Sequence, residues 1–405
     1  MSTRRAPRPN ARPATRLLHT GTAALTAGSG PVNIPVVRTS TVRFENSARH
    51  AELHHRRAAG ERVASYGRHG LDTHQALEEA VADLEQGHRA FLAPSGLSAI
   101  TLVLLALLSP GDHALVADNV YAPLRRVDQT LLQRLGITLE YIRPDAETLR
   151  QRITERTRLV YLESPSSLLY ELIDLPLLAG IARERGIPVA VDNTWSGGWF
   201  HQPLTLGANL SIQAATKYIS GHSDLMQGIV VVDSPALAAR LARTHEALGL
   251  TVGADDAYLA LRGLRTLGVR LAQHQQHALQ VAQWLQTQSQ VARVFYPALP
   301  DDPGHALWKR DFGGASGLLS FAFADADDAQ ADAFVDALHY FGIGASWGGY
   351  ESLALRAAPE RLREHSLWRD GGLDGRPVLR LHIGLEDPAD LIDDLAQAFE
   401  RLRGG

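Results

Sequence analysis

The organisation of this chain follows from one stretch, Ser211-Ile212-Gln213-Ala214-Ala215-Thr216-Lys217-Tyr218-Ile219-Ser220-Gly221-His222-Ser223-Asp224. Its first residues, from Asn209 to Ala214, predict a strand that runs into a polar turn. Lys217 lies at the junction, in a chain whose basic residues are nearly all arginine. A lysine at a strand exit, beside hydroxyl groups and a histidine, suits an amine that forms a Schiff base with an aldehyde. Taken alone, the stretch favours an ordinary solvated lysine, since most lysines have no chemical role.

A second stretch, Ile187-Pro188-Val189-Ala190-Val191-Asp192-Asn193-Thr194-Trp195, predicts an apolar strand that ends in a carboxylate. Ligands of open α/β sheets bind beyond the carboxyl ends of the strands. An aspartate there can pair with a protonated ring nitrogen and keep a pyridine cationic. An Asx turn that closes the strand is the common alternative for Asp192. The order of a strand ending in Asp and a later strand ending in Lys is the order that a pyridoxal phosphate (PLP) site needs.

The length and composition bound the class of protein. With 405 residues, 45% of them hydrophobic, the chain can bury a large core and is expected to form two or three domains. A formal net charge of -4 gives no electrostatic case for nucleic acid. The absence of cysteine excludes disulfides and Cys-ligated metals.

The start of the chain and its longest apolar run bear on location. Residues 1 to 15 are rich in Arg and Pro and have no apolar h-region, so they predict a disordered lead-in and not a secretory signal. The longest apolar run, Ile100 to Leu108, is too short to span a bilayer. A cytoplasmic protein without membrane or nucleic-acid partners is therefore expected.

Strands and helices alternate through the middle of the chain. Expected strands are 89–93, 114–117, 137–142, 159–163, 187–192, 209–213 and 229–232. Alternating βα units with short connections predict a mainly parallel, doubly wound α/β sheet. One long helix over residues 255–290, whose Arg262, Arg265 and Arg270 are expected on a solvated or interface face, leads to a smaller α/β domain. The predicted division is an N-terminal arm (1–59), a large domain (60–254) and a C-terminal part (255–405).

Two loops that follow strands are candidates for binding a cofactor. Pro94-Ser95-Gly96-Leu97-Ser98-Ala99 opens a helix, where free N–H groups and the positive end of the dipole favour an anion. No GKS or GKT follows, so the loop is not a P-loop. Tyr121 follows the next strand, where its ring could stack on a flat cofactor. A core tyrosine at the start of a helix fits the spacing equally well.

The arm precedes the fragment Tyr66-Gly67-Arg68-His69-Gly70. Residues 16 to 60 show little periodicity, and an arm without a core of its own is expected to pack on a partner subunit. Tyr66 and Arg68 both offer good donors to a phosphate, although an ordinary exposed turn would contain the same residues.

The C-terminal part contains two further candidates. Arg380 and His382 fall on one face of a strand predicted over residues 378–383. An arginine within an apolar strand needs an anion, which a substrate carboxylate or a structural Asp or Glu would supply. Ser346-Trp347-Gly348-Gly349 places a tryptophan beside two glycines, for which a core position next to a tight turn is the simple explanation.

Together these motifs resemble the Cys/Met-metabolism family of PLP enzymes, and within it the bacterial β-lyases. The resemblance runs from about Thr15 to near the C-terminus. Its further motifs, in the same order, are Glu163-Ser164-Pro165, Arg262-Gly263-Leu264-Arg265-Thr266-Leu267-Gly268-Val269-Arg270, Trp308-Lys309-Arg310-Asp311-Phe312, Tyr350-Glu351-Ser352 and Arg380-Leu381-His382-Ile383-Gly384-Leu385-Glu386-Asp387. It implies the PLP-dependent transferase fold of type I (aspartate-aminotransferase-like) and a homotetramer of two active dimers.

The resemblance also implies a role for each matching position. In the catalytic set, Lys217 would hold PLP covalently, Asp192 would pair with its ring nitrogen and Tyr121 would stack on its ring. The phosphate would be bound by Gly96, Leu97, Thr216 and, from the neighbouring subunit, Tyr66 and Arg68. The substrate carboxylate would be bound by Arg380, Ser346 and Trp347, with Tyr66 also facing the substrate. No metal is implied.

Two departures from the relatives that act at Cγ favour the β-lyase subgroup. Those relatives usually have Ser where this chain has Ala214, and tend to have Leu where it has Trp347. The resemblance therefore implies a carbon–sulfur β-lyase of methionine biosynthesis that converts L-cystathionine into homocysteine, pyruvate and ammonia.

Several alternatives stay open at this point. They are a cystathionine γ-synthase or γ-lyase, a related cysteine or cystine lyase, an aminotransferase on the same fold, and a non-catalytic protein that retains the fold. The presence of Asp192, Lys217 and Arg380 argues against the last of these.

Overall fold

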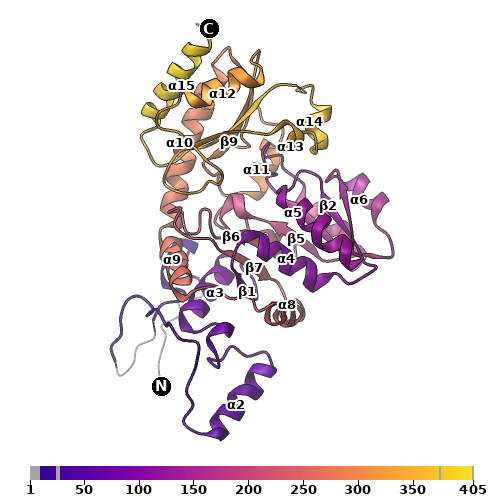
Figure 1. Cartoon of the computed structure of the whole chain (residues 1–405), viewed down its shortest axis with the longest axis vertical. Helices are drawn as coiled ribbons and strands as arrows, with labels where there is room; N and C mark the ends of the chain where they lie inside the picture. The colour runs from indigo at the N-terminus through magenta and orange to yellow at the C-terminus, as the bar shows by residue number, and fades with distance from the viewer. Residues whose placement is uncertain (1–9, 24–27, 374, 404–405) are drawn as a thin grey trace.

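A computed structural model describes residues 10–23, 28–373 and 375–403 (Figure 1). Its larger sheet has seven strands in the order β1-β7-β6-β5-β4-β2-β3. The strands are β1 (Arg89–Ala93), β2 (His113–Ala117), β3 (Thr138–Ile142), β4 (Thr157–Glu163), β5 (Val189–Asp192), β6 (Leu210–Ala214) and β7 (Gly228–Val232). Only the pairs that include β7 are antiparallel. The predicted mainly parallel α/β sheet is confirmed.

Helices pack on this sheet because its strands are apolar on both faces. They are α3 (Asp72–Leu84), α4 (Gly96–Leu107), α5 (Pro123–Val127), α6 (Ala146–Arg152), α7 (Leu175–Glu184) and α8 (Pro235–Ala247). Helix α4 carries no charged residue and is buried between β6, β7 and α8. This burial fixes the helix start at the carboxyl end of the sheet, beside the exit of β6.

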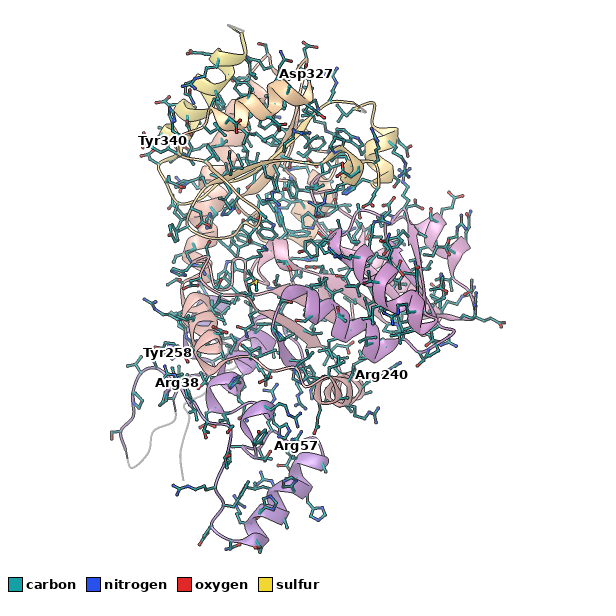
Figure 2. The ribbon with its side chains drawn as sticks, viewed as in Figure 1. Arg38, Arg57, Arg240, Tyr258, Asp327 and Tyr340 are labelled. Atoms are coloured by element: carbon teal, nitrogen blue, oxygen red, sulfur yellow. The ribbon has the colours of Figure 1, made fainter. Side chains whose placement is uncertain are left out.

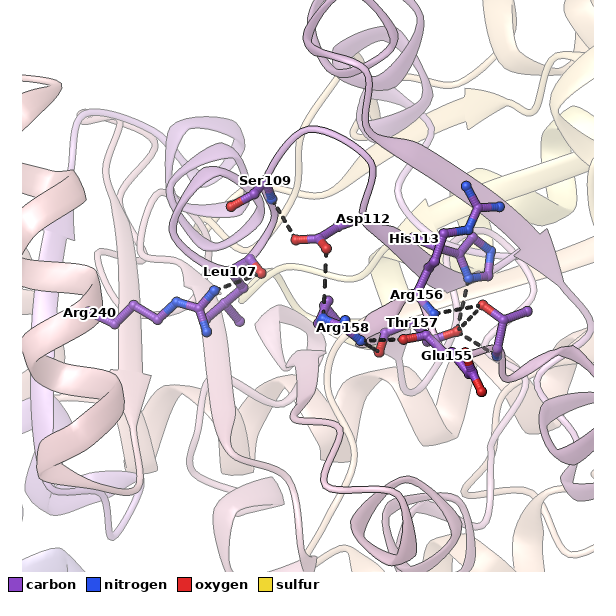
Figure 3. A network of polar contacts seen from close by, with 10 residues as sticks. Leu107, Ser109, Asp112, His113, Glu155, Arg156, Thr157, Arg158 and Arg240 are labelled. Carbon is purple, nitrogen blue, oxygen red and sulfur yellow. Dashed lines mark hydrogen bonds and ion pairs between the residues drawn. The ribbon is translucent and has the colours of Figure 1, made fainter.

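The opposite, amino ends of β2 and β4 are joined by polar contacts (Figure 3). His113 Nδ1 lies 3.0 Å from Thr157 Oγ1, and Thr157 Oγ1 also accepts from the Thr154 N–H at 2.8 Å. Asp112 accepts from the Ser109 N–H at 2.8 Å. These contacts hold the sheet at the end that faces away from Asp192 and Lys217.

A smaller sheet of five strands has the order β10-β11-β12-β9-β8. The strands are β8 (Val291–Phe295), β9 (Leu318–Phe323), β10 (Gly342–Ile343), β11 (Leu353–Arg356) and β12 (Val378–His382). The remaining helices of this part are α11 (His305–Asp311), α12 (Asp328–Asp336), α13 (Pro359–Leu362), α14 (Ser366–Asp370) and α15 (Pro388–Arg403). Its core includes a cluster of aromatic rings, Phe321, Phe323, Phe334 and Phe399. The boundary near residue 254 between two domains stays a prediction.

Two helices connect the sheets, α9 (Ala254–Arg265) and α10 (Leu267–Gln286). The prediction of one helix over residues 255–290 is wrong, because Thr266 leaves helical geometry at φ -109° and ψ 7°. The expected solvated or interface face is also wrong for Arg270, which is 7% exposed. Its guanidinium donates to Thr266 Oγ1 and to the Gly263 carbonyl, so the break between the helices provides its acceptors.

The arm contains α1 (Pro13–His19) and α2 (Ser47–Ala58). The expected disordered lead-in over residues 1–15 falls largely outside the described residues, and from Pro13 onward the chain is helical, with Arg16 paired to Asp83. Helix α2 has no buried residue and projects from the body at the lower edge of the view (Figures 1 and 2). No helix within the described residues is long and apolar enough to cross a membrane.

Candidate active site

Lys217 follows β6 in a tight turn, where the chain leaves the carboxyl end of the sheet. Its Nζ donates to Ser346 Oγ at 2.6 Å and lies 5.3 Å from the centre of the Trp347 ring. Burial and the nearby charge of Arg380 lower the pKa of the Lys217 amine to about 8, against a smaller opposing effect of Asp192. A sizeable fraction of this amine is therefore neutral, and nucleophilic, close to neutral pH.

The turn that carries Lys217 packs directly on Gly348. A Cβ atom at Gly348 would lie 2.9 Å from the Lys217 carbonyl carbon and 2.9 Å from the Tyr218 nitrogen, and the φ of Gly348 is +91°. Glycine is required both for the conformation and for the contact. The pair of glycines in the Ser346 motif thus brings Trp347 over Lys217, which the simple explanation of a core tryptophan did not anticipate.

Asp192 ends β5, the strand beside β6. Its Oδ1 accepts from the Thr194 N–H at 3.0 Å and from Thr194 Oγ1 at 2.5 Å. The carboxylate is 9% exposed, and no Lys or Arg among the described residues forms an ion pair with it. Burial raises the pKa of Asp192, and the hydrogen bonds from Thr194 oppose this increase. A buried carboxylate of this kind lacks a cation, which a protonated ring nitrogen would supply.

Glu163, which the sequence named only within the motif Glu163-Ser164-Pro165 and without a role, lies at the same edge of the sheet. It ends β4 and stands opposite Asp192 in the register of the two strands. Its Oε2 accepts from the Tyr121 N–H at 2.6 Å, and burial together with Asp192 raises the pKa of Glu163 well above its ordinary value. The signal was available, since Glu163 is a carboxylate at the end of a strand adjacent to the Asp192 strand.

Tyr121 lies at the same edge of the sheet, with its backbone held by Glu163. Its side chain is 42% exposed, and burial and the charge of Asp192 raise the pKa of its hydroxyl. These observations place the ring near Asp192 and outside the core, which disfavours the alternative of a core tyrosine. Stacking of the ring on a cofactor stays a prediction.

The start of α4 presents backbone N–H groups that have no partner among the described residues. Ser95 Oγ accepts from the Ser98 N–H at 3.1 Å, and Ser98 Oγ accepts from the Ser95 N–H at 2.8 Å. Across the described part of the chain, no acceptor is found for the N–H groups of Gly96 and Leu97. A Cβ atom at Gly96 would lie 2.8 Å from Ala214 Cβ, so glycine lets the helix start approach the end of β6.

Thr216 is the third expected phosphate ligand of this chain. Its Oγ1 accepts from the Gln227 N–H at 2.9 Å and lies 3.2 Å from the Gln227 carbonyl. The hydroxyl hydrogen must therefore turn away from Gln227 if it is to donate to a phosphate.

Arg380 faces the same region from β12. Its Nη2 donates to the Ser346 carbonyl at 3.0 Å, and no Asp or Glu of the described residues pairs with its guanidinium. Burial lowers the pKa of Arg380. The structural Asp or Glu that competed with a substrate carboxylate in the sequence analysis is therefore absent from the described chain. His382, two residues on, contacts Tyr218 and the Gly349 carbonyl.

Tyr66 and Arg68 are not brought to this site within one chain. Tyr66 is 43% exposed and pairs with Thr41, while Arg68 donates to the Glu246 carbonyl at 3.4 Å. Both line an open hollow of about 370 Å³ beside the arm. In the part of the chain that is described, neither contacts Lys217, Asp192 or Arg380.

The segment that contains α13 and α14 belongs to the part of the chain with the small sheet and lies beside the site. No sequence motif predicted this position. The Ser366 N–H donates to Asp118 at 3.0 Å and Glu364 pairs with Arg125 at 3.0 Å, so α13 and α14 are fixed on the loop that carries Tyr121. Arg361 on α13 is near enough for its charge to influence both Tyr121 and Arg380.

Comparisons with known proteins extend over nearly the whole chain. The family model described as "Cys/Met metabolism PLP-dependent enzyme" matches residues 14–400. A cystathionine β-lyase of Bordetella avium is 50% identical over 389 residues, which are 96% of this chain and 97% of the relative. A cystathionine β-lyase of Salmonella typhimurium is 40% identical, covering 92% of this chain and 94% of the relative.

The fold is also similar to that of a solved structure. The cystathionine γ-synthase of Xanthomonas oryzae pv. oryzae, in complex with aminoacrylate and cysteine, superposes with a TM-score of 0.88 at 34% identity. The match covers 97% of this chain and 99% of that structure.

Proposed function

Because this chain belongs to the family of Cys/Met-metabolism PLP-dependent enzymes, we propose that it cleaves L-cystathionine by β-elimination to homocysteine, pyruvate and ammonia. The fold is the PLP-dependent transferase fold of type I, the cofactor is PLP, and the chain is a PLP-dependent carbon–sulfur lyase. The high identity to cystathionine β-lyases supports the choice of substrate and of β-elimination.

The observation that carries the proposal is that Ser346 accepts a hydrogen bond from both Lys217 and Arg380. Lys217 Nζ donates to Ser346 Oγ, and Arg380 donates to the carbonyl of the same residue. A guanidinium without a carboxylate partner in the described chain thus stands beside an amine of lowered pKa. An α-amino acid fits both groups, since its carboxylate would bind Arg380 in a bidentate way while its Cα faces Lys217.

The residues present also fit PLP. Asp192 is a buried carboxylate that has no cationic partner among the described residues. The N–H groups of Gly96 and Leu97 lie beside the end of β6, the strand that Lys217 follows. We propose that Asp192 holds the positive charge at the ring nitrogen, that Gly96, Leu97 and Thr216 bind the phosphate, and that Tyr121 covers the ring.

Bound PLP supplies an electron sink for the electron pair that remains at Cα when a proton is removed. The neutral amine of Lys217 takes that proton, and Trp347 and Ser346 hold the amine over the site. The bond between Cβ and sulfur then breaks, and the sulfur leaves as the thiolate of homocysteine, which Lys217 protonates. The three-carbon remainder takes up water and gives pyruvate and ammonia, so that atoms and charges balance.

The alternative is elimination or replacement at Cγ, as in the γ-synthase of similar structure. Ala214 and Trp347 are the positions that favour the β-lyase subgroup. Trp347 lies against Tyr218, at 5.5 Å between ring centres, as well as over Lys217. The Trp347 ring thus fills space above the Lys217 amine, at the position where the Cγ enzymes tend to have the smaller Leu.

The test is the identity of the keto acid. Purified protein incubated with L-cystathionine should release pyruvate and homocysteine in equal amounts. Release of 2-oxobutyrate and cysteine would instead assign γ-elimination. A stable yellow protein that releases neither would exclude both lyase activities and leave an aminotransferase or a binding protein.

Quaternary structure and location are part of the proposal. Among the described residues Tyr66 and Arg68 contact none of Lys217, Asp192 and Arg380, and α2 has no buried residue. Both observations support completion of each site by a neighbouring subunit and a homotetramer of two such dimers. Light scattering tests the assembly, and cell fractionation tests the proposed cytoplasmic location.

A further inference from the structure

Behind the candidate site lies a buried carboxylate that the mechanism above does not use. Glu85 follows the last residue of α3, and none of its surface is exposed. No Lys or Arg is paired with it in the described chain, so its acceptors are satisfied by neutral groups alone. Burying an unpaired carboxylate is costly, and a group kept at that cost calls for an explanation.

The donors to Glu85 come from the two strands that carry the proposed catalytic residues. Asn193, directly after Asp192, donates from Nδ2 to both carboxylate oxygens at 3.2 Å. Gln213, four residues before Lys217, donates from Nε2 to Oε1 at 2.5 Å. Glu85 is thus a single acceptor that joins the end of β5 to the end of β6.

The amide of Asn193 has no freedom to turn away. Its Oδ1 accepts from Ser196 Oγ at 2.6 Å and lies 3.0 Å from His201 Nδ1, and its Nδ2 also donates to the His201 carbonyl at 2.9 Å. Its backbone N–H donates to the Ile212 carbonyl of β6 at 2.8 Å. The orientation of this amide is therefore fixed, with its donors directed at Glu85.

The space around the carboxylate is equally restricted. A Cβ atom at Gly198 would lie 2.8 Å from Glu85 Oε1 and 3.3 Å from Gln213 Nε2, and Gly198 has a φ of +72°. Backbone closes this side of the cluster, so Glu85 cannot move without moving the strand ends. On the other side of β5, Thr194 links Asp192 to the Ala214 N–H at 2.9 Å, so the two strand ends are tied twice.

We propose that Glu85, in its ionised form, is a positioning residue that sets the placement of Asp192 relative to Lys217 by drawing Asn193 and Gln213 onto one carboxylate. Each of its contacts is a donated hydrogen bond, which only the ionised form accepts with all its lone pairs. Protonation would place an O–H among donors and force the Gln213 amide to turn, since its Oε1 has no partner in the described chain.

This inference rests on the PLP cofactor that the family assigns and not on the thioether that is cleaved. The readout is the visible absorption band of bound cofactor without substrate, and the pH at which that band changes, because both depend on the charges of Lys217 and Asp192. Glu85→Gln is the first variant, since it keeps the shape and removes the charge. Glu85→Gln combined with Gln213→Glu is the second, since it returns one carboxylate to the same cluster with the donor and acceptor exchanged.

We expect Glu85→Gln to shift the titration midpoint of the band by about one pH unit or more and to lower kcat about tenfold or more, with KM changed by less than about threefold. The double variant should restore both the midpoint and kcat to within about threefold. Thr157→Val, in the polar contacts at the opposite end of the sheet, is the matched control. It should lower the melting temperature without moving the band.

A folded Glu85→Gln protein with an unchanged band midpoint and an unchanged kcat would overturn the proposal and leave Glu85 a structural residue. The proposal would also be overturned if the double variant had a band midpoint and a kcat no closer to wild type than those of Glu85→Gln. If Glu85→Gln does not fold, Gln213→Met takes its place, because it removes one of the two amides from Glu85. An unchanged band in that variant would count against the proposal in the same way.

Discussion

Arg380 Nη2 donates to the carbonyl oxygen of Ser346 at 3.0 Å, and this is the one polar side-chain contact found for its guanidinium in the described chain. Ser346 itself has a φ of +84°, a conformation that costs a non-glycine residue on the order of 1–3 kcal/mol. The strained residue directs its carbonyl to Arg380 and its hydroxyl to Lys217. Ser346 thereby directs the side chains of Arg380 and Lys217 toward the same side of the site.

Arg380→Lys should raise the KM for L-cystathionine by a factor of about ten or more while cofactor binding changes little. A point charge cannot replace the two parallel donors of a guanidinium toward a carboxylate. The measurement is steady-state kinetics together with the cofactor content of the purified variant. Loss of cofactor at an unchanged KM would assign Arg380 to the phosphate side or to the scaffold.

Gly348→Ala should disable the site while the two sheets stay folded. The added methyl group would press on the backbone of Lys217 and Tyr218, and alanine strongly disfavours a φ of +91°. We expect kcat to fall about 100-fold or more, with a circular dichroism spectrum like that of the parent. Gly180→Ala is the control, because a Cβ atom there would meet nothing within 4 Å. Equal kinetics for Gly348→Ala and Gly180→Ala would show that the contact with Lys217 does not matter.

Glu85 should make the free energy of unfolding depend on pH between 4.5 and about 7. Burial raises its pKa from 4.5 to about 7, so between these values the folded protein holds a proton that the unfolded chain has lost. Folding stability should therefore fall as pH rises from 4.5 to 7, by ~3 kcal/mol, and change no further above that range. Melting temperatures of wild type and Glu85→Gln, compared at pH 5 and pH 8, measure this contribution. A difference between the two proteins that is the same at both pH values would contradict the assignment.

Tyr66 and Arg68 lead to a prediction about subunits. If Arg68 completes the neighbour's site, mixing the inactive variants Lys217→Ala and Arg68→Ala should regenerate activity. Random exchange makes about half of the dimers mixed, and one of the two sites in each is then free of lesions, so about a quarter of all sites should be active. Mass measurement verifies the exchange. Activity that stays at the sum of the two parents would place Arg68 in its own chain's site or in the scaffold.

The parts of the site that the sequence predicted are those whose signals are local. Asp192 ends one apolar strand and Lys217 comes three residues after another, and parallel strands bring their carboxyl ends to one edge. Arg380 was predicted because an arginine in an apolar strand stands out without any knowledge of its neighbours. Its lack of a carboxylate partner is a tertiary fact, and it became visible only in the fold.

The parts that were missed depend on packing between distant segments. Glu85 directly follows α3, and its partners Asn193 and Gln213 are more than 100 residues away in the sequence. Arg270 was expected on a solvated or interface face because helical periodicity does not show which polar residue finds acceptors at a helix break. In each case the arrangement of remote backbone groups decides the role.

The central claim is that the chemistry takes place on Lys217, and reductive trapping tests it most directly. Borohydride treatment of the holoenzyme, followed by proteolysis and mass spectrometry, locates the lysine that carries the reduced cofactor. The account predicts one labelled peptide, containing Lys217, and no fixed cofactor in Lys217→Ala, which should bind PLP noncovalently and show no turnover. Label on Lys309, or cofactor fixed equally well in Lys217→Ala, would contradict it.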